Sequence, residues 1–562
     1  MSLLASMPGV GLHSLLQQLP FDYSIDACDP ASVQVTADDS AALDNIKVCG
    51  LCADSRELAT GDIFAALQGG SYHGLDYLEL VNRKAAALLV DIGDARAASI
   101  ETPLPVVRVS SLSDRLGEIA ATVYQHPTAK MKVCGVTGTD GKTSVSRFIA
   151  LVLQELGLRA GYIGTIGWGL ADGTVDRTVD NDDLVAELED NPLTTPPPAT
   201  LQAMLASLQQ RKAEYVVLEV SSHALAQGRT SGVQFDVVAL TNLGRDHLDY
   251  HHTLENYRAA KRMLFDWPGI DKAVLNLDDE FGREIAGDFA ANETSAAKVA
   301  GYSINTSSET QPASELFATD VVADTRGVAF TLHHKAQQWR VETGLLGHFN
   351  VSNLLAASAV LMNFGIDLPR IIKALSRLKP VDGRMERFHA AGRPTAVVDY
   401  SHTPQSLGLA LETVRQHCDG ALWVVFGCGG DRDRGKRPQM GRQAVELADH
   451  VVVTDDNPRT ESSAEIIDEI LAGTHSADRS GSSSCLDLTV IADRREAIVY
   501  AMTNAAAADW VLVAGKGHED YQIVGTDQLH FSDRAVVTEL LSAAAPDSAL
   551  SRSGQNVIRE AT

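Results

Sequence analysis

The segment MKVCGVTGTDGKTS, residues 131–144, restricts the possible folds more than any other part of the chain. Its first six residues have the length and apolar character of a buried strand, and a glycine-rich stretch follows directly. A helical pattern then continues to Gly157, with apolar residues on one face at Phe148, Ile149, Val152, Leu153 and Leu156. A strand, a glycine-rich loop and a helix in this order predict an α/β domain, with the loop at the carboxyl end of a parallel strand.

The glycine-rich loop has the residue types of a phosphate-binding loop. Glycines let backbone N–H groups wrap phosphate oxygens, and the following helix adds the positive end of its dipole. Lys142 is placed to neutralise β- and γ-phosphate charge, and the Thr143 hydroxyl to bind Mg²⁺. The strict pattern requires glycine at position 136, where this chain has Val136, so the motif is a variant. A glycine turn with a surface lysine is the alternative, but the flanking strand and helix favour phosphate binding.

Apolar runs of strand length divide the 562 residues into three predicted domains. Residues 1–128 mix short strands and helices, whereas 129–346 and 347–562 each alternate strands with helical patterns. The runs are MKVCGV, YVVLEV, FDVVALT and KAVLNL in the second domain, and TAVVDY, LWVVFG, HVVVTD, LTVIAD and WVLVAG in the third. We therefore predict a small N-terminal α/β domain, a central phosphate-loop domain with a parallel sheet, and a C-terminal Rossmann-like α/β domain.

Composition excludes several classes of function. The net charge of −26, from 47 basic and 73 acidic residues, argues against a nucleic-acid-binding protein, which needs a basic face. Seven cysteines are scattered, and the pair Cys49 and Cys52 has no second pair at zinc spacing, so we expect structural thiols. The chain has no apolar run of about 18 residues. Its first 20 residues lack Lys and Arg, and Leu12, Leu15, Leu16 and Leu19 there share one helical face. We expect no membrane span and a cytoplasmic location.

Acidic and histidine side chains follow the next predicted strands. Glu219 lies near the end of YVVLEV. After FDVVALT, the six positions 246–251 contain Asp246, His247, Asp249 and His251. A zinc site is one interpretation, but no cysteine joins the group, and His with carboxylates also suits Mg²⁺ or Mn²⁺ beside ATP phosphates. Helix capping without a metal is the third. The segments 171–192 and 475–485 are acidic or Ser/Gly-rich and predict surface loops.

A series of motifs resembles the Mur ligases of peptidoglycan synthesis, in the order of that family and over nearly the whole chain. They are TGTDGKTS, LEVSSHALAQGR, TNLGRDHLDYH, YRAAK, GHFNVSN, GRME, VVDYSHTP, GCGGDRDRGKRP, DDNPR and GKGHED. The resemblance implies one domain for a uridine nucleotide, one for ATP and one for an amino acid. It further implies an ATP-dependent ligase that adds meso-2,6-diaminopimelate to the D-glutamate γ-carboxylate of UDP-N-acetylmuramoyl-L-alanyl-D-glutamate through an acyl phosphate.

The resemblance also implies the residues of each subsite. ATP is expected at Gly138, Thr139, Asp140, Gly141, Lys142, Thr143, Ser144, Asn350, Arg384, Asp399 and His402. The UDP-muramoyl-dipeptide is expected at Ser55, Thr194, Thr195, Ser221, Gln227 and Arg229. Mg²⁺ is expected at Thr143, Glu219, His247 and Lys261, and the catalytic group is Lys142, Lys261, His247 and Glu219. The family carries the lysine matching Lys261 as a carbamate, which replaces an ammonium that would repel the metal; the alternative is a plain lysine on a helix surface.

Diaminopimelate is expected in the third domain, at Arg432, Asp456, Asn457, Pro458, Arg459, Gly515 and Glu519. Glu519 would bind an ammonium, while Arg432 and Arg459 would bind carboxylates by paired hydrogen bonds. Within the family DNPR accompanies diaminopimelate, whereas lysine-adding members differ there. The alternative for Arg459 is an internal ion pair with Asp455 or Asp456.

The sequence departs from the family pattern at a few positions. Asp140 stands where Asn is usual, Ser401 where Ala is usual, Leu193 where Asn is frequent and His73 where Asp is usual. These bear on substrate contacts and not on the reaction. The rival interpretations are a lysine-adding Mur ligase, a folylpolyglutamate synthase, and a phosphate-loop switch or transport ATPase without ligase activity. The expected partners are the three small-molecule substrates alone, bound by a monomer.

Overall fold

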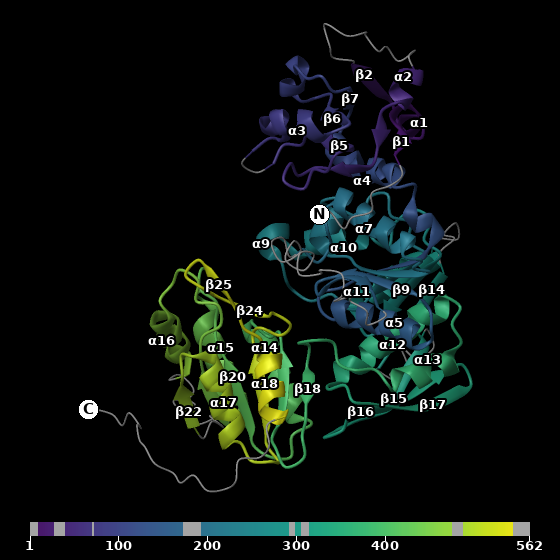
Figure 1. Cartoon of the computed structure of the whole chain (residues 1–562). Helices are drawn as coiled ribbons and strands as arrows, with labels where there is room; N and C mark the ends of the chain where they lie inside the picture. The colour runs from purple at the N-terminus through teal and green to yellow at the C-terminus, as the bar shows by residue number, and fades with distance from the viewer. Residues whose placement is uncertain are drawn as a thin grey trace. The chain divides into compact units, whose positions relative to one another are not determined.

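The computed structural model describes residues 9–26, 40–69, 72–171, 193–291, 298–304, 314–474 and 487–542. The predicted loops at 172–192 and 475–485 lie outside them. The chain forms two compact units (Figure 1): Met1–Val322 with Ala329–Thr343 and Phe349–Leu378, and Ala323–Val328 with Gly344–His348 and Lys379–Thr562. Both units are α/β, which confirms the predicted fold class. The division into three domains at residues 128 and 346 stays a prediction.

The N-terminal part of the first unit is a five-stranded sheet in the order β2-β7-β6-β5-β4. β2 is antiparallel to β7, and the other neighbours are parallel. The strands are β2 (Tyr23–Asp26), β4 (Gly50–Cys52), β5 (Asp62–Ala65), β6 (Ala87–Asp91) and β7 (Val106–Val109), beside a short pair, β1 (Val10–Gly11) and β3 (Lys47–Val48). The helices are α1 (Leu12–Leu16), α2 (Ser40–Asp44), η1 (Gly74–Tyr77), α3 (Leu78–Lys84), η2 (Ala95–Ser99), α4 (Leu112–Val123) and η3 (Pro127–Lys130).

Side chains of this sheet alternate between two apolar cores, as the two-residue period of a strand requires. Ile63 and Leu89 pack in one core, and Phe64 and Leu88 pack in the other. The four leucines predicted to share one face of an N-terminal helix are all buried in the first core, although the helix itself ends at Leu16. The predicted helical face is confirmed for Leu12, Leu15 and Leu16, whereas Leu19 is buried from the turn beyond the helix.

The rest of the first unit is built on a ten-stranded sheet in the order β10-β9-β11-β8-β12-β13-β14-β15-β16-β17. The strands are β8 (Lys132–Thr137), β9 (Ala160–Gly164), β10 (Gly167–Leu170), β11 (Tyr215–Glu219), β12 (Val237–Leu240), β13 (Lys272–Asn276), β14 (Lys298–Ser303), β15 (Ser314–Asp324), β16 (Gly327–His334) and β17 (Gln337–Thr343). Every pair from β9 to β15 is parallel, and β10 is antiparallel to β9. The long strands β15 to β17 were not identified from the sequence.

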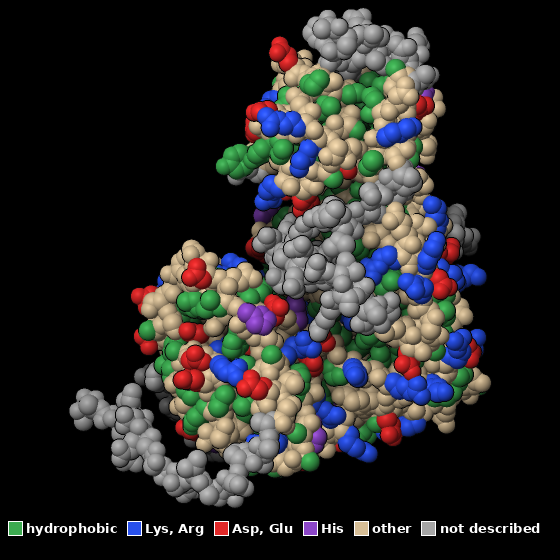
Figure 2. Space-filling model, viewed as in Figure 1, with side chains coloured by type: hydrophobic (Ala, Val, Ile, Leu, Met, Phe, Trp, Pro, Cys, Tyr) green, Lys and Arg blue, Asp and Glu red, His purple; other side chains and the backbone are tan. Residues whose placement is uncertain are grey.

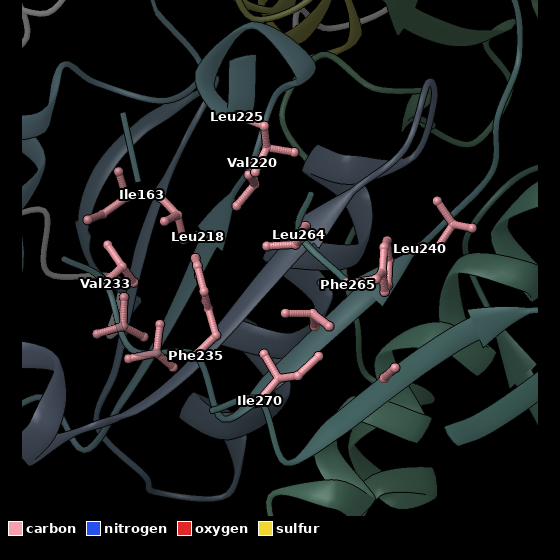
Figure 3. Close-up of a cluster of buried hydrophobic side chains, with 14 of the residues drawn as sticks. Ile163, Leu218, Val220, Leu225, Val233, Phe235, Leu240, Leu264, Phe265 and Ile270 are labelled. Atoms are coloured by element: carbon pink, nitrogen blue, oxygen red, sulfur yellow. The ribbon is translucent and has the colours of Figure 1, made fainter. Parts of the chain in front are cut away.

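The faces of this sheet are covered by helices. These are α5 (Lys142–Glu155), α7 (Pro198–Gln210), α8 (Ser222–Ala226), α9 (Leu248–His251), α10 (Leu254–Arg262), α11 (Glu280–Ala291), α12 (His348–Asn363) and α13 (Leu368–Leu375). Figure 3 shows the core on one face, where Leu218 and Leu240 lie with Phe235, Leu264 and Phe265. Fully buried apolar residues, each contributing about 1.5–3 kcal/mol, hold the strands whose ends carry the polar residues.

The second unit has a six-stranded sheet in the order β18-β19-β23-β20-β21-β22. Its strands are β18 (Glu386–Phe388), β19 (Thr395–Asp399), β20 (Leu422–Phe426), β21 (His450–Val453), β22 (Asp487–Val490) and β23 (Trp510–Ala514), followed by the hairpin β24 (Tyr521–Val524) and β25 (Asp527–His530). All neighbours except the antiparallel β18 and β19 are parallel. The helices are α14 (Pro404–Arg415), α15 (Lys436–Leu447), α16 (Ser463–Thr474), α17 (Arg494–Asn504) and α18 (Asp533–Ser542). The predicted strands of this domain are confirmed.

The inner strands of this second sheet, β19, β23, β20 and β21, are buried on both faces. Val398 and Val513 pack against α17 and α18, and the alternate residues Val397 and Leu512 are fully buried as well.

On the face shown in Figure 2, acidic and basic side chains occur side by side over the described surface. Within the described ranges, the structure contains no helix that is both long and apolar enough to cross a membrane.

Candidate active site

The phosphate loop lies at the carboxyl edge of the central sheet. β8 runs between β11 and β12 and parallel to both, so the segments after all three strands meet at one edge. A Cβ atom on Gly138 would lie 1.8 Å from Thr241 Oγ1, and one on Gly141, whose φ is 80°, would lie 2.6 Å from Asn353 Oδ1. Both positions therefore require glycine because neighbouring segments approach too closely for a larger residue, whether or not a phosphate is bound.

Backbone groups of the loop are held by the segment after β12. Asn242 accepts the Thr139 N–H at its carbonyl and the Asp140 N–H at Oδ1, both at 2.9 Å. The Thr241 hydroxyl donates to the Asp140 carbonyl at 2.5 Å. The Asp140 side chain is exposed. Asn242 thus fixes the loop shape, a role that sequence reasoning did not identify.

Two lysines converge on the same carbonyl of the loop. Lys142 Nζ donates to Gly138 O at 2.9 Å and to Thr139 O at 2.8 Å, and Lys261 Nζ donates to Gly138 O at 2.7 Å. Lys261 is 1% exposed and its Nζ lies 4.6 Å from the centre of the Tyr257 ring. Burial, and then the charge of Lys142, hold the pKa of Lys261 well below its usual value. The alternative of a lysine on a helix surface is wrong.

Glu219 is fully buried and has four donors in the residues around it. Its Oε2 accepts the Thr143 hydroxyl at 2.9 Å and the Thr165 hydroxyl at 3.0 Å. Its Oε1 accepts the Thr165 N–H at 3.1 Å and the Tyr162 hydroxyl. Burial, with the neighbouring Glu219, raises the pKa of Tyr162. Sequence reasoning missed Tyr162 and Thr165; the apolar run AGYIG before Thr165 was the available signal.

The oxygen donors of this region fit a hard cation such as Mg²⁺. Thr143 and Glu219 present a hydroxyl and a carboxylate in contact, next to the glycine-rich loop predicted to bind phosphate. Within the described ranges, no three His, Cys, Asp or Glu side chains gather closely enough to hold a metal by themselves. This argues against the zinc interpretation. Thr143 and Glu219 would fit Mg²⁺ if phosphate oxygens and the carbamate form of Lys261 supplied the other ligands.

His247, the remaining predicted metal ligand, lies on an exposed turn. Its φ is 53°, and its ring lies edge-on to that of His223 with centroids 4.8 Å apart. His251 is buried, and its Nε2 lies 3.0 Å from the Ser222 hydroxyl. Partial burial lowers the pKa of His223 and His247, and burial lowers that of His251. They share a cluster of rings with Tyr250 and Tyr257 beside the phosphate loop.

Four of the residues predicted to contact the UDP-muramoyl-dipeptide form one polar group beside Glu219. The Thr195 hydroxyl donates to the Glu219 carbonyl at 2.7 Å and accepts the Ser221 N–H at 3.1 Å. Arg229 Nη1 donates to the Thr195 carbonyl at 2.9 Å, and its Nε donates to Gln227 Oε1 at 2.9 Å.

The other predicted contacts of this unit lie around that group. The Thr194 hydroxyl lies 3.0 Å from that of Thr165, while Ser55 is buried in the turn after β4. Asn350 in α12 accepts from Asn353, the residue packed over Gly141. The structure therefore brings Thr194 into the group at Glu219, and places Ser55 and Asn350 on other elements.

In the second unit, three predicted ATP contacts lie near the end of β19. Asp399 accepts the backbone N–H groups of Met385 at 2.8 Å and Ser401 at 3.0 Å. The Arg384 guanidinium lies 4.6 Å from the centre of the Tyr400 ring. Burial lowers the pKa of His402, whose Nδ1 lies 2.8 Å from the Tyr400 carbonyl.

The predicted diaminopimelate residues also lie at a carboxyl sheet edge, after β20, β21 and β23. A Cβ atom on Gly430 would lie 1.9 Å from Pro458 O, so the glycine-rich segment lies directly on the DNPR segment. A Cβ on Gly429 would lie 2.9 Å from Arg459 Nη1 and 3.7 Å from Arg432 Cγ. The two arginines therefore flank the same glycine, as the expectation of a shared pocket requires.

Arg459 is half-buried in a left-handed conformation, with φ at 52°. Its Nη1 donates to Gly430 O at 2.8 Å, and no ion pair among the described residues includes it. Asp455 instead accepts from Ser463 at 2.5 Å, and Asp456 lies 3.3 Å from Lys516 Nζ. The alternative in which Arg459 pairs with Asp455 or Asp456 is absent from the structure.

Comparisons with known proteins find relatives for both the central part of the chain and its C-terminal part. A family model described as the Mur ligase middle domain matches residues 136–361, and one described as the Mur ligase glutamate ligase domain matches residues 383–517. UDP-N-acetylmuramoyl-L-alanyl-D-glutamate–2,6-diaminopimelate ligase of Alkalilimnicola ehrlichii is 44% identical over 506 residues, 89% of this chain and 95% of the relative. The protein of the same name from Coxiella burnetii is 40% identical over 498 residues, 88% of this chain and 96% of the relative.

Solved structures show the same likeness. One of a protein with that ligase name has a TM-score of 0.63 at 32% identity, covering 95% of this chain and 99% of the other. A MurF structure from Acinetobacter baumannii, at 17% identity and a TM-score of 0.61, covers 96% of this chain and 100% of the other, and shows likeness of fold alone.

Proposed function

This chain belongs to the Mur ligase family, and from that membership we propose that it is an ATP-dependent ligase of peptidoglycan precursor synthesis. It joins meso-2,6-diaminopimelate to the D-glutamate γ-carboxylate of UDP-N-acetylmuramoyl-L-alanyl-D-glutamate. Relatives that share more than nine-tenths of their length with this chain bear the name of that reaction. The cytoplasm is the proposed compartment, because ATP is a co-substrate, and a monomer is the proposed working state.

One observation carries the proposal. The phosphate loop, the buried carboxylate of Glu219 and the polar group of Thr195, Ser221 and Arg229 meet at one edge of the central sheet. That edge offers positive charge and N–H donors for a triphosphate beside hydroxyl and guanidinium donors for an anionic partner. A reaction between a carboxylate and ATP needs this combination.

The reaction begins with two anions. The γ-carboxylate attacks the γ-phosphorus of ATP, the bond to the β-phosphate oxygen breaks, and an acyl phosphate and ADP result. The Lys142 ammonium and the loop N–H groups offset the repulsion and stabilise the spread charge of the transition state. Mg²⁺, when bound, would supply further positive charge at the phosphate oxygens. Thr143, Glu219, His247 and the carbamate of Lys261 are the proposed ligands.

An amine of the amino acid then attacks the acyl carbon, and inorganic phosphate leaves as the amide forms. The proposed amino-acid pocket lies in the second unit. The two arginines that flank Gly429 would bind carboxylates, and Glu519 would bind the ammonium at the far end of the substrate. Diaminopimelate has one more carboxylate than lysine, which accounts for Arg459 standing outside any ion pair among the described residues.

The proposal is tested by phosphate release from ATP with UDP-N-acetylmuramoyl-L-Ala-D-Glu, adding meso-diaminopimelate or L-lysine separately. We expect release with diaminopimelate alone. Release with lysine would keep the ligase and overturn the account of Arg459. Release that no amino acid stimulates would instead indicate an ATPase without ligase activity.

Replacing Arg459 with Ala is expected to raise KM for diaminopimelate roughly 10- to 100-fold, because a hydrogen bond to a charged group contributes about 1.5–3 kcal/mol. The KM for ATP should stay unchanged. Steady-state phosphate release measures both. Arg495→Ala is the control, since Arg495 pairs with Glu539 on the surface of the same unit. An Arg459→Ala enzyme with the wild-type KM for diaminopimelate would contradict the assignment.

A further inference from the structure

Lys516, which follows β23, is a lysine with no exposed surface that the reaction described above does not use. Its Nζ donates to Asn457 Oδ1 at 2.8 Å and to the Tyr521 carbonyl at 2.9 Å. It also lies 3.3 Å from Asp456 Oδ1 and 3.7 Å from Glu519 Oε2. One buried ammonium thus contacts the DNPR segment, the GKGHED segment and the β24 strand together.

The contact with Lys516 determines how the Asn457 amide is oriented. Asn457 Oδ1 accepts both Lys516 Nζ and the Ile523 N–H, the latter at 3.0 Å, so its Nδ2 faces Glu519 Oε2 at 3.2 Å. If Asn457 were flipped, its NH₂ would face two donors, and Glu519 would lose its own. The chain from Lys516 through Asn457 therefore holds the Glu519 carboxylate by one oxygen. Among the described residues, its Oε1 takes part in no hydrogen bond or ion pair.

The β24 strand and the residue after it also hold the backbone of Arg459. The Arg459 N–H donates to Ile523 O at 3.0 Å, and the Gly525 N–H donates to Arg459 O at 2.8 Å. Gln522 Nε2 donates to the Asp456 carbonyl at 2.7 Å. A left-handed conformation at a non-glycine residue costs roughly 1–2 kcal/mol. The β24 strand offsets that cost by these bonds, and Lys516 ties the strand to the pocket.

The charges around Lys516 also indicate a role for it in the amino-acid pocket. Asp456 and Glu519 are two largely buried carboxylates, and Lys516 lies between them. Burial raises the pKa of Glu519. Burial acts in the same direction on Asp456, but Lys516 and Arg494 outweigh it, so the pKa of Asp456 lies below its usual value. The three groups together carry one net negative charge, which suits a single substrate ammonium.

We propose that Lys516 is a positioning residue for the incoming amino acid: it orients Asn457 and thereby Glu519, and it balances the charge of Asp456. It does not touch the reacting atoms. Its removal leaves two buried carboxylates without their shared cation, and Asn457 without the donor that fixes its orientation. This proposal rests on the proposed function, because it assigns the amino-acid site to this pocket.

The test is steady-state kinetics of the full chain with Lys516→Met, which keeps an unbranched side chain one atom shorter and removes its charge. We expect KM for meso-diaminopimelate to rise at least roughly tenfold, the effect of losing one hydrogen bond to a charged group. The KM values for ATP and the UDP-muramoyl-dipeptide should change by less than about twofold, since neither substrate is assigned to this pocket. A role in stability alone would lower Tm and the active fraction but leave KM for diaminopimelate unchanged.

Two further variants keep the test decisive. Lys516→Gln retains a donor but no charge, and we expect an intermediate KM; it carries the test if Lys516→Met does not fold. Arg415→Met is the matched control, since it removes a half-buried cation that pairs with Asp449 at 2.8 Å, at the amino end of β20. The proposal is overturned if the folded Lys516 variants keep the wild-type KM for diaminopimelate, or if all three KM values rise together. Failure of the proposed function itself would appear separately, as wild-type enzyme that does not consume diaminopimelate.

Discussion

Replacing Lys142 with Met is expected to lower kcat by roughly 10²- to 10³-fold or more, the usual effect of removing one preorganised electrostatic contact to a transition state. Lys142 begins α5, and its ammonium lies within 2.9 Å of two carbonyls of the phosphate loop. Transfer of a phosphoryl group to a carboxylate brings negative charges together, and this ammonium is placed to offset them. Phosphate release at saturating concentrations of all substrates measures the change.

The control for Lys142 is Lys373→Met, at an exposed lysine of α13 in the same unit, which should have wild-type kcat. ADP binding and the Tm of each variant distinguish lost chemistry from lost folding. A Lys142→Met enzyme that is folded and retains more than about a tenth of the wild-type kcat would show that other groups stabilise the phosphoryl transfer.

Replacing Lys261 with Gln is expected to lower kcat by a similar factor, roughly 10²-fold or more, because it removes a proposed metal ligand. Lys261 and Lys142 both donate to the Gly138 carbonyl oxygen, so the two side-chain nitrogens lie close together around one acceptor. Burial and the Lys142 charge lower the pKa of Lys261, and the neutral amine that results is the form that adds CO₂. Carbamylation would turn one of two like charges into a carboxylate, which attracts the Lys142 ammonium instead of repelling it.

The carbamate has a direct signature. Wild-type protein in ¹³C-bicarbonate should show a carbamate carbon resonance that Lys261→Gln lacks. Since the pKa of Lys261 is lowered, the neutral amine gains population as pH rises through that value, and the resonance should grow in the same direction and fade on acidification. An unchanged resonance in Lys261→Gln would assign the signal elsewhere, and wild-type activity in that variant would remove Lys261 from the reaction.

Much of the fold followed from local patterns. The strands predicted for the central and C-terminal sheets are present because each is a short apolar run bounded by polar or glycine-rich residues. A strand that is buried on both faces is apolar throughout, so it can be recognised without knowing which strands lie beside it. Glu219 was found because it lies at the end of such a strand, and Asn457 because it belongs to the DDNPR motif of the family. Tyr162 and Thr165 were missed because β9, which contains Tyr162 and directly precedes Thr165, was not among the predicted strands. Asn242 was missed because its role is to hold another loop.

The sequence by itself determined the glycine-rich loop between a strand and a helix, most of the buried parallel strands, and the family, because these depend on neighbouring residues and on motifs of fixed spacing. Only the tertiary structure decided that Lys261 reaches Gly138 across 123 positions and that Lys516 reaches Asn457 across 59. It also decided that Arg459 pairs with neither aspartate beside it. Such contacts arise where parallel strands bring distant loops to one edge, and which donor meets which acceptor there depends on the packing of the whole sheet.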